Sequence, residues 1–261
     1  MNDTPAKRED PWDELRRWTD ARIALGRAGT SLPTKPLLEF QLSHAMARDA
    51  VIRECDFTGT EASCASLGLE TLAVKSLAAT RSDYLRRPDH GRLLDGDSER
   101  RLDDFARGAP AKDVCVIVAD GLSSLAVERQ APEFLRELKS RSDVFGYSFG
   151  PVVFASQARV ALSDEIGSRL KASLVVMMIG ERPGLSSPDS LGVYLTWHPR
   201  RGLQNADRNC ISNVRPAGLT APRAAELAMR LIRGSFHLRA SGIGLKEDSY
   251  LSIPENDASA G

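Results

Sequence analysis

The chain has 261 residues, of which 42% are hydrophobic, so it can bury a core in one large domain or two small ones. Lysine plus arginine and aspartate plus glutamate each number 35, and this balance argues against a general nucleic-acid-binding protein, which normally carries a basic excess. The four cysteines and four histidines form neither a C-x-x-C pair nor an H-E-x-x-H motif, so no metal site is predicted. No secretory signal and no apolar run near the ~20 residues of a membrane-spanning helix are present, which predicts a reduced, cytoplasmic protein.

Helical patterns dominate the first part of the chain. Asp10 and Pro11 are suited to begin a helix, and apolar residues at helical spacing continue it to about Leu25. Further helical patterns cover residues 38–50, 69–85 and 99–105. No strand-like alternation stands out here, so we expect a helical N-terminal domain of residues 1–108.

The pattern changes after Gly108. Short apolar runs, several of them rich in β-branched residues, predict strands at residues 113–119, 150–154, 174–179, 191–197 and 210–214. Helical patterns lie between them and after the last one, and strands that alternate with helices indicate a doubly wound α/β arrangement. We therefore predict an α/β protein, in which the helical region precedes a Rossmann-like doubly wound α/β domain of residues 109–261 with a disordered tail after Ser252.

The loop that follows the apolar run of residues 174–179 is the strongest candidate for ligand binding. In open α/β sheets ligands lie beyond the carboxyl ends of buried parallel strands, and here that position is Gly180-Glu181-Arg182-Pro183-Gly184. Glu181 has two interpretations of about equal weight. It accepts hydrogen bonds from ligand donors, or it pairs with Arg182 or Arg200 and only holds the loop.

Familiar catalytic motifs are absent, since the sequence has no G-x-G-x-x-G after a strand, no G-x-x-x-x-G-K-[ST] and no G-x-S-x-G. The turn of residues 120–123 comes nearest to a phosphate-binding strand–turn–helix, but Asp120 would repel a phosphate. Its backbone N–H groups can still bind polar ligand atoms. The favoured interpretation is that Asp120 or Ser123 caps the following helix.

Two other groups of residues have a structural interpretation. As a nucleophile, Cys210 would need an adjacent base, for which His198 is the only nearby candidate in the sequence. A small buried thiol packed against its neighbours is favoured over that role. Arginines such as Arg81, Arg86 and Arg87 stand among acidic residues and are interpreted as solvated faces.

Short motifs spread over nearly the whole chain resemble the small (light) subunit of ethanolamine ammonia-lyase. Each motif is weak alone, but their order and spacing are specific to that family. The matching segments are residues 19–27, 31–34, 40–44, 47–50, 86–89, 119–123, 164–167, 180–185, 207–208 and 210–213.

The resemblance implies a subunit of an adenosylcobalamin-dependent lyase that converts ethanolamine to acetaldehyde and ammonia. In this family the large subunit, a TIM barrel, holds the substrate site, and the small subunit closes over the corrin within a hetero-oligomer. Three small-subunit positions are assigned to cobalamin, and they match Val160, Glu181 and Cys210 of this sequence. The resemblance therefore implies cofactor-binding residues in this chain and no catalytic residue of its own.

On the sequence alone, two alternative functions stay open. In the first, the chain is a free-standing α/β enzyme or nucleotide-binding module that uses the Asp120 and Glu181 loops; in the second, it is a scaffold that needs the large subunit and never touches the cofactor. The location of the complex is also open. Members housed in bacterial microcompartments often carry a longer N-terminal extension, so a plain cytoplasmic complex competes with an encapsulated one.

Overall fold

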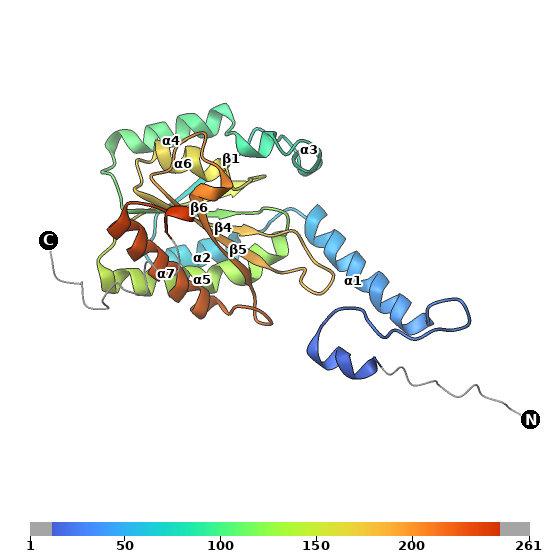
Figure 1. The fold of residues 1–261 in the computed structure, drawn as a ribbon. Helices are drawn as coiled ribbons and strands as arrows, with labels where there is room; N and C mark the ends of the chain where they lie inside the picture. Colours follow the sequence, from blue (N-terminus) through green and yellow to red (C-terminus); the bar gives the residue numbers. More distant parts are fainter. Residues whose placement is uncertain (1–11, 246–261) are drawn as a thin grey trace, which may run out of the picture.

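The computed structural model describes residues 12–245, which form a six-stranded sheet with helices on both faces (Figure 1). The strand order is β1-β3-β2-β4-β5-β6. The first four strands in this order run parallel, β5 is antiparallel to β4, and β6 is antiparallel to β5. The strands are β1 Thr71–Lys75, β2 Val114–Ala119, β3 Phe149–Ser156, β4 Leu174–Gly180, β5 Leu191–Trp197 and β6 Arg208–Val214.

Seven α-helices connect and flank these strands within the described residues: α1 Thr34–Ile52, α2 Thr58–Ser66, α3 Arg81–Arg86, α4 Gly96–Gly108, α5 Ser124–Phe145, α6 Leu162–Arg169 and α7 Ala221–Leu238. Short 3-10 turns cover Asp13–Trp18, His90–Arg92, Asn205–Asp207 and Gly242–Gly244. None of the helices in residues 12–245 combines the length and apolar character needed to cross a bilayer.

Alternating side chains of the sheet build two cores. On β2, Val116 belongs to the core shared with α5 and α7, whereas Ile117 belongs to the core shared with α4 and α6. Every residue of β2 and β4 is buried, as expected for parallel strands covered on both faces. The predicted fold class, α/β with helices on both sides of the sheet, is confirmed. The more detailed description as Rossmann-like stays a prediction.

The first part of the chain differs from the sequence prediction. Residues 69–85 are not one helix, because Thr71–Lys75 is the edge strand β1 and α3 begins only at Arg81. The N-terminal region is helical as predicted, with α1 to α4 before residue 109, but the helix predicted over residues 69–85 is wrong. The sheet also includes β1, which lies before the predicted boundary. Only Val74 of β1 is buried, so its short apolar run resembles a helix turn until it pairs with β3. The division into two domains at that boundary stays a prediction.

The predicted first helix is also shorter than expected. Within the described residues it is the single turn Asp13–Trp18, after which Thr19 is extended. An isolated turn of helix is marginal without packing, and Trp18 is 77% exposed. The start predicted at Asp10 and the tail after Ser252 lie outside the described residues.

The loops after β2 and β4 approach each other closely through two glycines. The amide of Leu122 donates to the carbonyl of Gly180 over 2.9 Å, and Gly121 has a φ of +56°. A Cβ on Gly121 would lie 2.2 Å from the Gly180 oxygen, and one on Gly180 would lie 2.1 Å from the Ser123 oxygen. Only glycine fits at both positions, so the two loops form one rigid edge of the sheet.

Replacing Gly180 by alanine tests this contact. We expect Gly180→Ala to lower the free energy of unfolding by at least about 2 kcal/mol, because backbone atoms must move to admit the methyl group. The thermal midpoint would then fall by roughly 4–8 °C. Gly59→Ala in α2 is the control, since a Cβ there meets nothing within 4 Å and alanine favours the helix. Equal midpoints for Gly180→Ala and the wild type would show that the loops do not touch.

Candidate functional site

A pocket lies at the carboxyl edge of the sheet, where the chain reverses its direction of winding. β2 has β3 on one side and β4 on the other, and the connecting helices α5 and α6 lie on opposite faces of the sheet. This is the position at which open α/β sheets bind ligands. The pocket has a volume of about 280 Å³ and is lined by Tyr84, Gly121, Leu122, Arg159, Val160, Ile179, Gly180, Glu181, Arg182 and Tyr194.

The three residues predicted to bind cobalamin come together at this pocket, although they are far apart in the sequence. Val160, after β3, and Glu181, after β4, both line it. Cys210 of β6 stands opposite Tyr194 of β5 in the strand register, and Tyr194 also lines the pocket. The hydroxyl of Tyr194 and the thiol of Cys210 share a hydrogen bond, so Cys210 borders the pocket through Tyr194.

Glu181 is held by hydroxyl groups and a backbone amide. Its carboxylate accepts hydrogen bonds from Ser190 Oγ at 2.5 Å, Ser212 Oγ at 2.5 Å and the amide of Asn213 at 3.2 Å. No ion pair between Glu181 and an arginine occurs within residues 12–245, so the predicted alternative of pairing with Arg182 or Arg200 is not what holds the loop. A carboxylate has about four acceptor directions, which leaves about one for a ligand.

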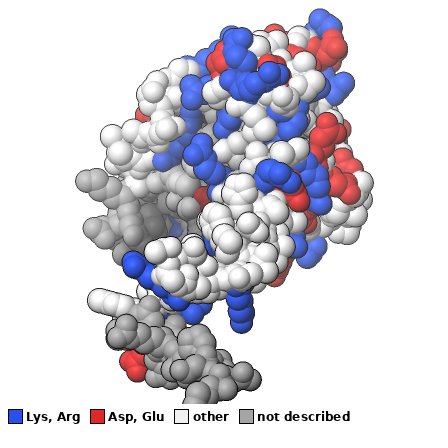
Figure 2. Space-filling view, turned by 90° about the vertical axis from the view of Figure 1, so that its right-hand side faces the viewer, with Lys and Arg blue, Asp and Glu red and all other residues white. Residues whose placement is uncertain are grey.

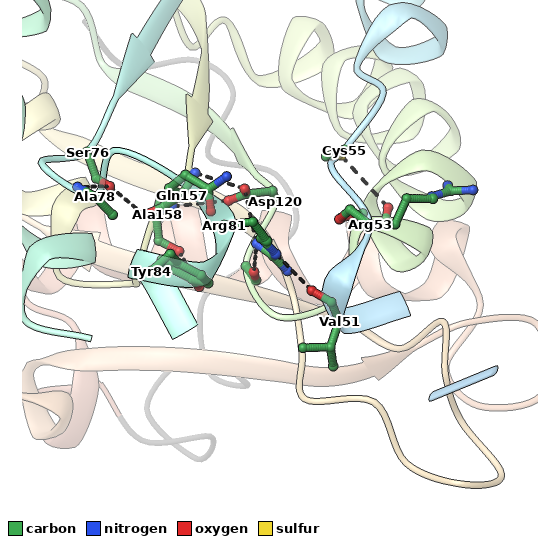
Figure 3. Close-up of polar contacts among 12 residues, drawn as sticks. Val51, Arg53, Cys55, Ser76, Ala78, Arg81, Tyr84, Asp120, Gln157 and Ala158 are labelled. Atoms are coloured by element: carbon green, nitrogen blue, oxygen red, sulfur yellow. Dashed lines mark hydrogen bonds and ion pairs between the residues drawn. The ribbon is translucent and has the colours of Figure 1, made fainter. Parts of the chain in front are cut away.

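The carboxylate of Asp120 is buried and hydrogen-bonded inside the protein (Figure 3). It is 2% exposed and accepts hydrogen bonds from the amides of Gln157 at 2.8 Å and Ala158 at 3.1 Å. Arg81 Nη1 lies 3.3 Å from the same carboxylate. Burial raises the pKa of Asp120, and the Arg81 charge opposes that shift. The helix cap is instead Ser123, whose Oγ accepts from the amide of Ala126.

Arg81 connects this carboxylate to two other segments. Its Nη1 donates to the carbonyl of Gly121 and its Nε to the carbonyl of Val51, each at 2.8 Å (Figure 3). The residue is 6% exposed, so its interpretation as part of a solvated face is wrong. Sequence reasoning missed it because its partners are 30 to 40 positions away.

Two arginines pack against the Tyr84 ring beside the pocket, and of these two Arg159 lines it. The guanidinium carbons of Arg81 and Arg159 lie 4.9 Å and 4.3 Å from the centre of the Tyr84 ring. The Tyr84 hydroxyl donates to the carbonyl of Ala158 at 3.0 Å, which fixes the ring. Arg81 Nη2 and Arg159 Nε are buried and have no hydrogen-bond acceptor among the described residues. Buried donors without an acceptor are costly, so a ligand oxygen would be favoured beside them.

Cys210 has the environment of a neutral thiol. Partial burial raises its pKa, as does the charge of Glu181, whereas the hydrogen bond from Tyr194 acts in the opposite direction. A thiol of raised pKa is a poor nucleophile at neutral pH. Its hydrogen-bonding partner is Tyr194, and no contact of Cys210 with His198 is found in residues 12–245. The raised pKa disfavours a role as nucleophile, but the predicted burial of the thiol is wrong, because Cys210 is exposed.

Other residues of the matching motifs stabilise the framework. Asp164 accepts two hydrogen bonds from Arg208, at 2.9 Å and 2.7 Å, and this buried ion pair joins α6 to β6. A Cβ on Gly167 would lie 2.3 Å from a methyl group of Val175, so α6 approaches β4 only with glycine there. The face of the molecule on the right-hand side of Figure 1 carries basic side chains scattered among acidic and uncharged ones (Figure 2). The described residues contain no cluster of histidine, cysteine and carboxylate side chains that could hold a metal ion.

The Asp120 network predicts a large effect of a small substitution. Asp120→Asn keeps the size of the side chain but places an NH2 group against an amide donor and removes the charge that faces Arg81. We expect the free energy of unfolding to fall by about 2–4 kcal/mol, measured by urea denaturation. The control Asp104→Asn removes the exposed ion pair with Arg107 and should change stability by less than about 1 kcal/mol. A similar small loss for both variants would contradict the buried network.

Comparisons with known proteins agree with this geometry. Residues 9–246 match the family model described as Ethanolamine ammonia-lyase light chain (EutC). The chain is 50% identical to a protein of Pseudomonas syringae pv. tomato over 96% of this chain and 88% of that protein. It is 49% identical to a protein of Ralstonia nicotianae over 97% of this chain and 95% of that protein. Both relatives are named ethanolamine ammonia-lyase small subunit, and the chain belongs to the ethanolamine ammonia-lyase light chain family, subunits of a lyase.

Proposed function

We propose that the pocket beside β2 and β4 is part of an adenosylcobalamin site, which a larger, catalytic subunit completes. The holoenzyme would convert ethanolamine to acetaldehyde and ammonia. One observation carries the proposal: Val160 and Glu181 line a single pocket at the switch point of the sheet, and Cys210 borders it through Tyr194. The large subunit, expected to be a TIM barrel from the family resemblance, would hold the substrate.

The polar groups of the pocket fit the periphery of a corrin. The amide side chains of cobalamin carry both N–H donors and carbonyl acceptors, and its nucleotide tail carries a phosphodiester. Arg159, which lines the pocket, offers a buried Nε donor without an acceptor among the described residues, and Glu181 keeps about one acceptor direction. Donors and acceptors of the chain therefore match those of the cofactor.

The size of the pocket indicates that this chain holds only part of the cofactor. A volume of about 280 Å³ lies just below the roughly 300–1,000 Å³ typical of sites for drug-sized ligands. A peripheral amide arm fits such a pocket, whereas a complete corrin with its nucleotide tail does not. The remainder of the cofactor must contact another surface, for which the large subunit is the candidate.

The cofactor supplies the radical chemistry when bound, and this chain would position it. Glu181 and Arg159 would fix the orientation of peripheral groups, and Val160 would shield an apolar surface from water. The pocket lining places no nucleophile beside a base, which agrees with a substrate site elsewhere. The carboxylate of Asp120 is occupied by internal donors, so it is not available to bind a ligand.

Substitution of Glu181 tests the cofactor site. We expect Glu181→Ala to weaken binding of cyanocobalamin to the assembled two-subunit complex by about 10- to 100-fold, because a charged acceptor is lost. The affinity is measured by equilibrium dialysis, and assembly by size-exclusion chromatography. Glu133→Gln, on the exposed side of α5, is the control and should bind normally. An unchanged affinity of Glu181→Ala in an intact complex would remove Glu181 from the site.

Alkylation of Cys210 provides a second test that does not depend on activity. Cys210 is exposed in the isolated chain, whereas Cys64 and Cys115 are buried. Because burial raises the pKa of its thiol, labelling with iodoacetamide is carried out at alkaline pH. We expect cyanocobalamin to slow labelling of Cys210 in the assembled complex, as measured by peptide mass spectrometry, with Cys210→Ser as the control. Equal rates with and without cyanocobalamin would place the cofactor away from β6.

A further inference from the structure

Helix α1 projects away from the sheet and has little packing of its own (Figure 1). Of its 19 residues, Ala50 alone is buried. Its carboxyl end is anchored where Arg81 Nε donates to the Val51 carbonyl and Ser124 Oγ donates to the Arg53 carbonyl at 2.6 Å. The anchor lies in the network that builds the edge of the sheet around the candidate site, so α1 starts from the same edge as the pocket.

The projecting segment exposes a large apolar area. Nine large apolar side chains between residues 15 and 52 are 40–77% exposed: Leu15, Trp18, Leu32, Leu37, Leu38, Phe40, Leu42, Met46 and Ile52. Their exposed area is on the order of 900 Å², which exceeds the few hundred Å² of apolar patches on monomers and matches the roughly 800 Å² per partner of a standard interface. A partner therefore has to cover this segment.

The exposed apolar residues of α1 do not form a single stripe. Phe40 and Leu42 lie on nearly opposite sides, because two positions along a helix correspond to about 200° of rotation. Leu38 and Met46 lie on the same side as Leu42, since positions four apart share one face of a helix. A helix with apolar side chains on two opposite sides needs cover on both. Two copies of this chain that pack α1 against α1 would cover only one side of each helix, so a symmetric dimer leaves the rest exposed.

We propose that α1, together with the segment of residues 15–33, inserts into an apolar groove of the larger subunit. This inference rests on the proposed function, because that function supplies a larger chain at the edge of the sheet where α1 is anchored. The groove would have to be apolar on at least two walls to enclose Phe40 and Leu42 together. Through the Arg81 anchor, docking of α1 would also position the pocket against the partner.

The test compares double substitutions in the complex of the two subunits. Leu38→Glu combined with Leu42→Glu places two charges on side chains that are 58% and 64% exposed, so the chain itself should stay folded with an unchanged melting temperature. We expect its affinity for the large subunit to fall by at least 100-fold. Leu38→Met with Leu42→Met keeps the surface apolar and should assemble normally. Val144→Glu, at a position 73% exposed on α5, controls for added charge on an apolar surface site.

Assembly is measured by size-exclusion chromatography with light scattering on both subunits produced together. Failure of the wild-type pair to assemble would overturn the proposed function and this inference with it. Normal assembly of the wild type and of the double glutamate variant would overturn this inference alone. In a third outcome, the wild-type chain forms a dimer, the two glutamates dissociate that dimer, and binding to the large subunit is unchanged. This result would overturn the inference, because α1 would then form a contact between copies of this chain.

Discussion

The carboxylate of Asp120 is the meeting point of several segments that are distant in the sequence, and its burial makes each of its hydrogen bonds important. It receives the amides of Gln157 and Ala158 and the guanidinium of Arg81, which also reaches the carbonyls of Gly121 and Val51. An unpaired carboxylate would be costly at 2% exposure. The loops after β2 and β3, the start of α3 and the end of α1 are therefore held in one arrangement.

The pocket depends on this rigid arrangement. The contact of Gly121 with Gly180 adds the loop after β4 to the same unit, and the hydrogen bonds of Glu181 to Ser212 and Asn213 add β6. Each group that faces the pocket thus comes from an element fixed by buried contacts. A binding site that is already ordered binds its ligand more tightly, because no free energy is spent on ordering the side chains when the ligand binds.

The same edge of the sheet is incomplete in two respects. The pocket has room for only a part of a large cofactor and offers the buried Nε donor of Arg159, which has no acceptor among the described residues. Beside it, α1 exposes apolar side chains on two opposite sides. Both properties are explained together by a larger subunit that covers this edge, which agrees with the membership of the chain in a family of enzyme subunits.

The sequence by itself determined the elements whose apolar residues follow a regular pattern along the chain. β2 and β4 are continuous apolar runs, a helical pattern follows the last strand where α7 lies, and the motifs identify the family, so these predictions are confirmed. Only the tertiary structure decided the role of β1, because an edge strand with one buried residue becomes a strand by pairing with β3. It also decided the burial of Arg81 and the approach of Cys210 to the pocket. The burial of Arg81 depends on partners that are distant in the chain, and the position of Cys210 depends on the register of β5 and β6. Local sequence patterns do not predict such contacts.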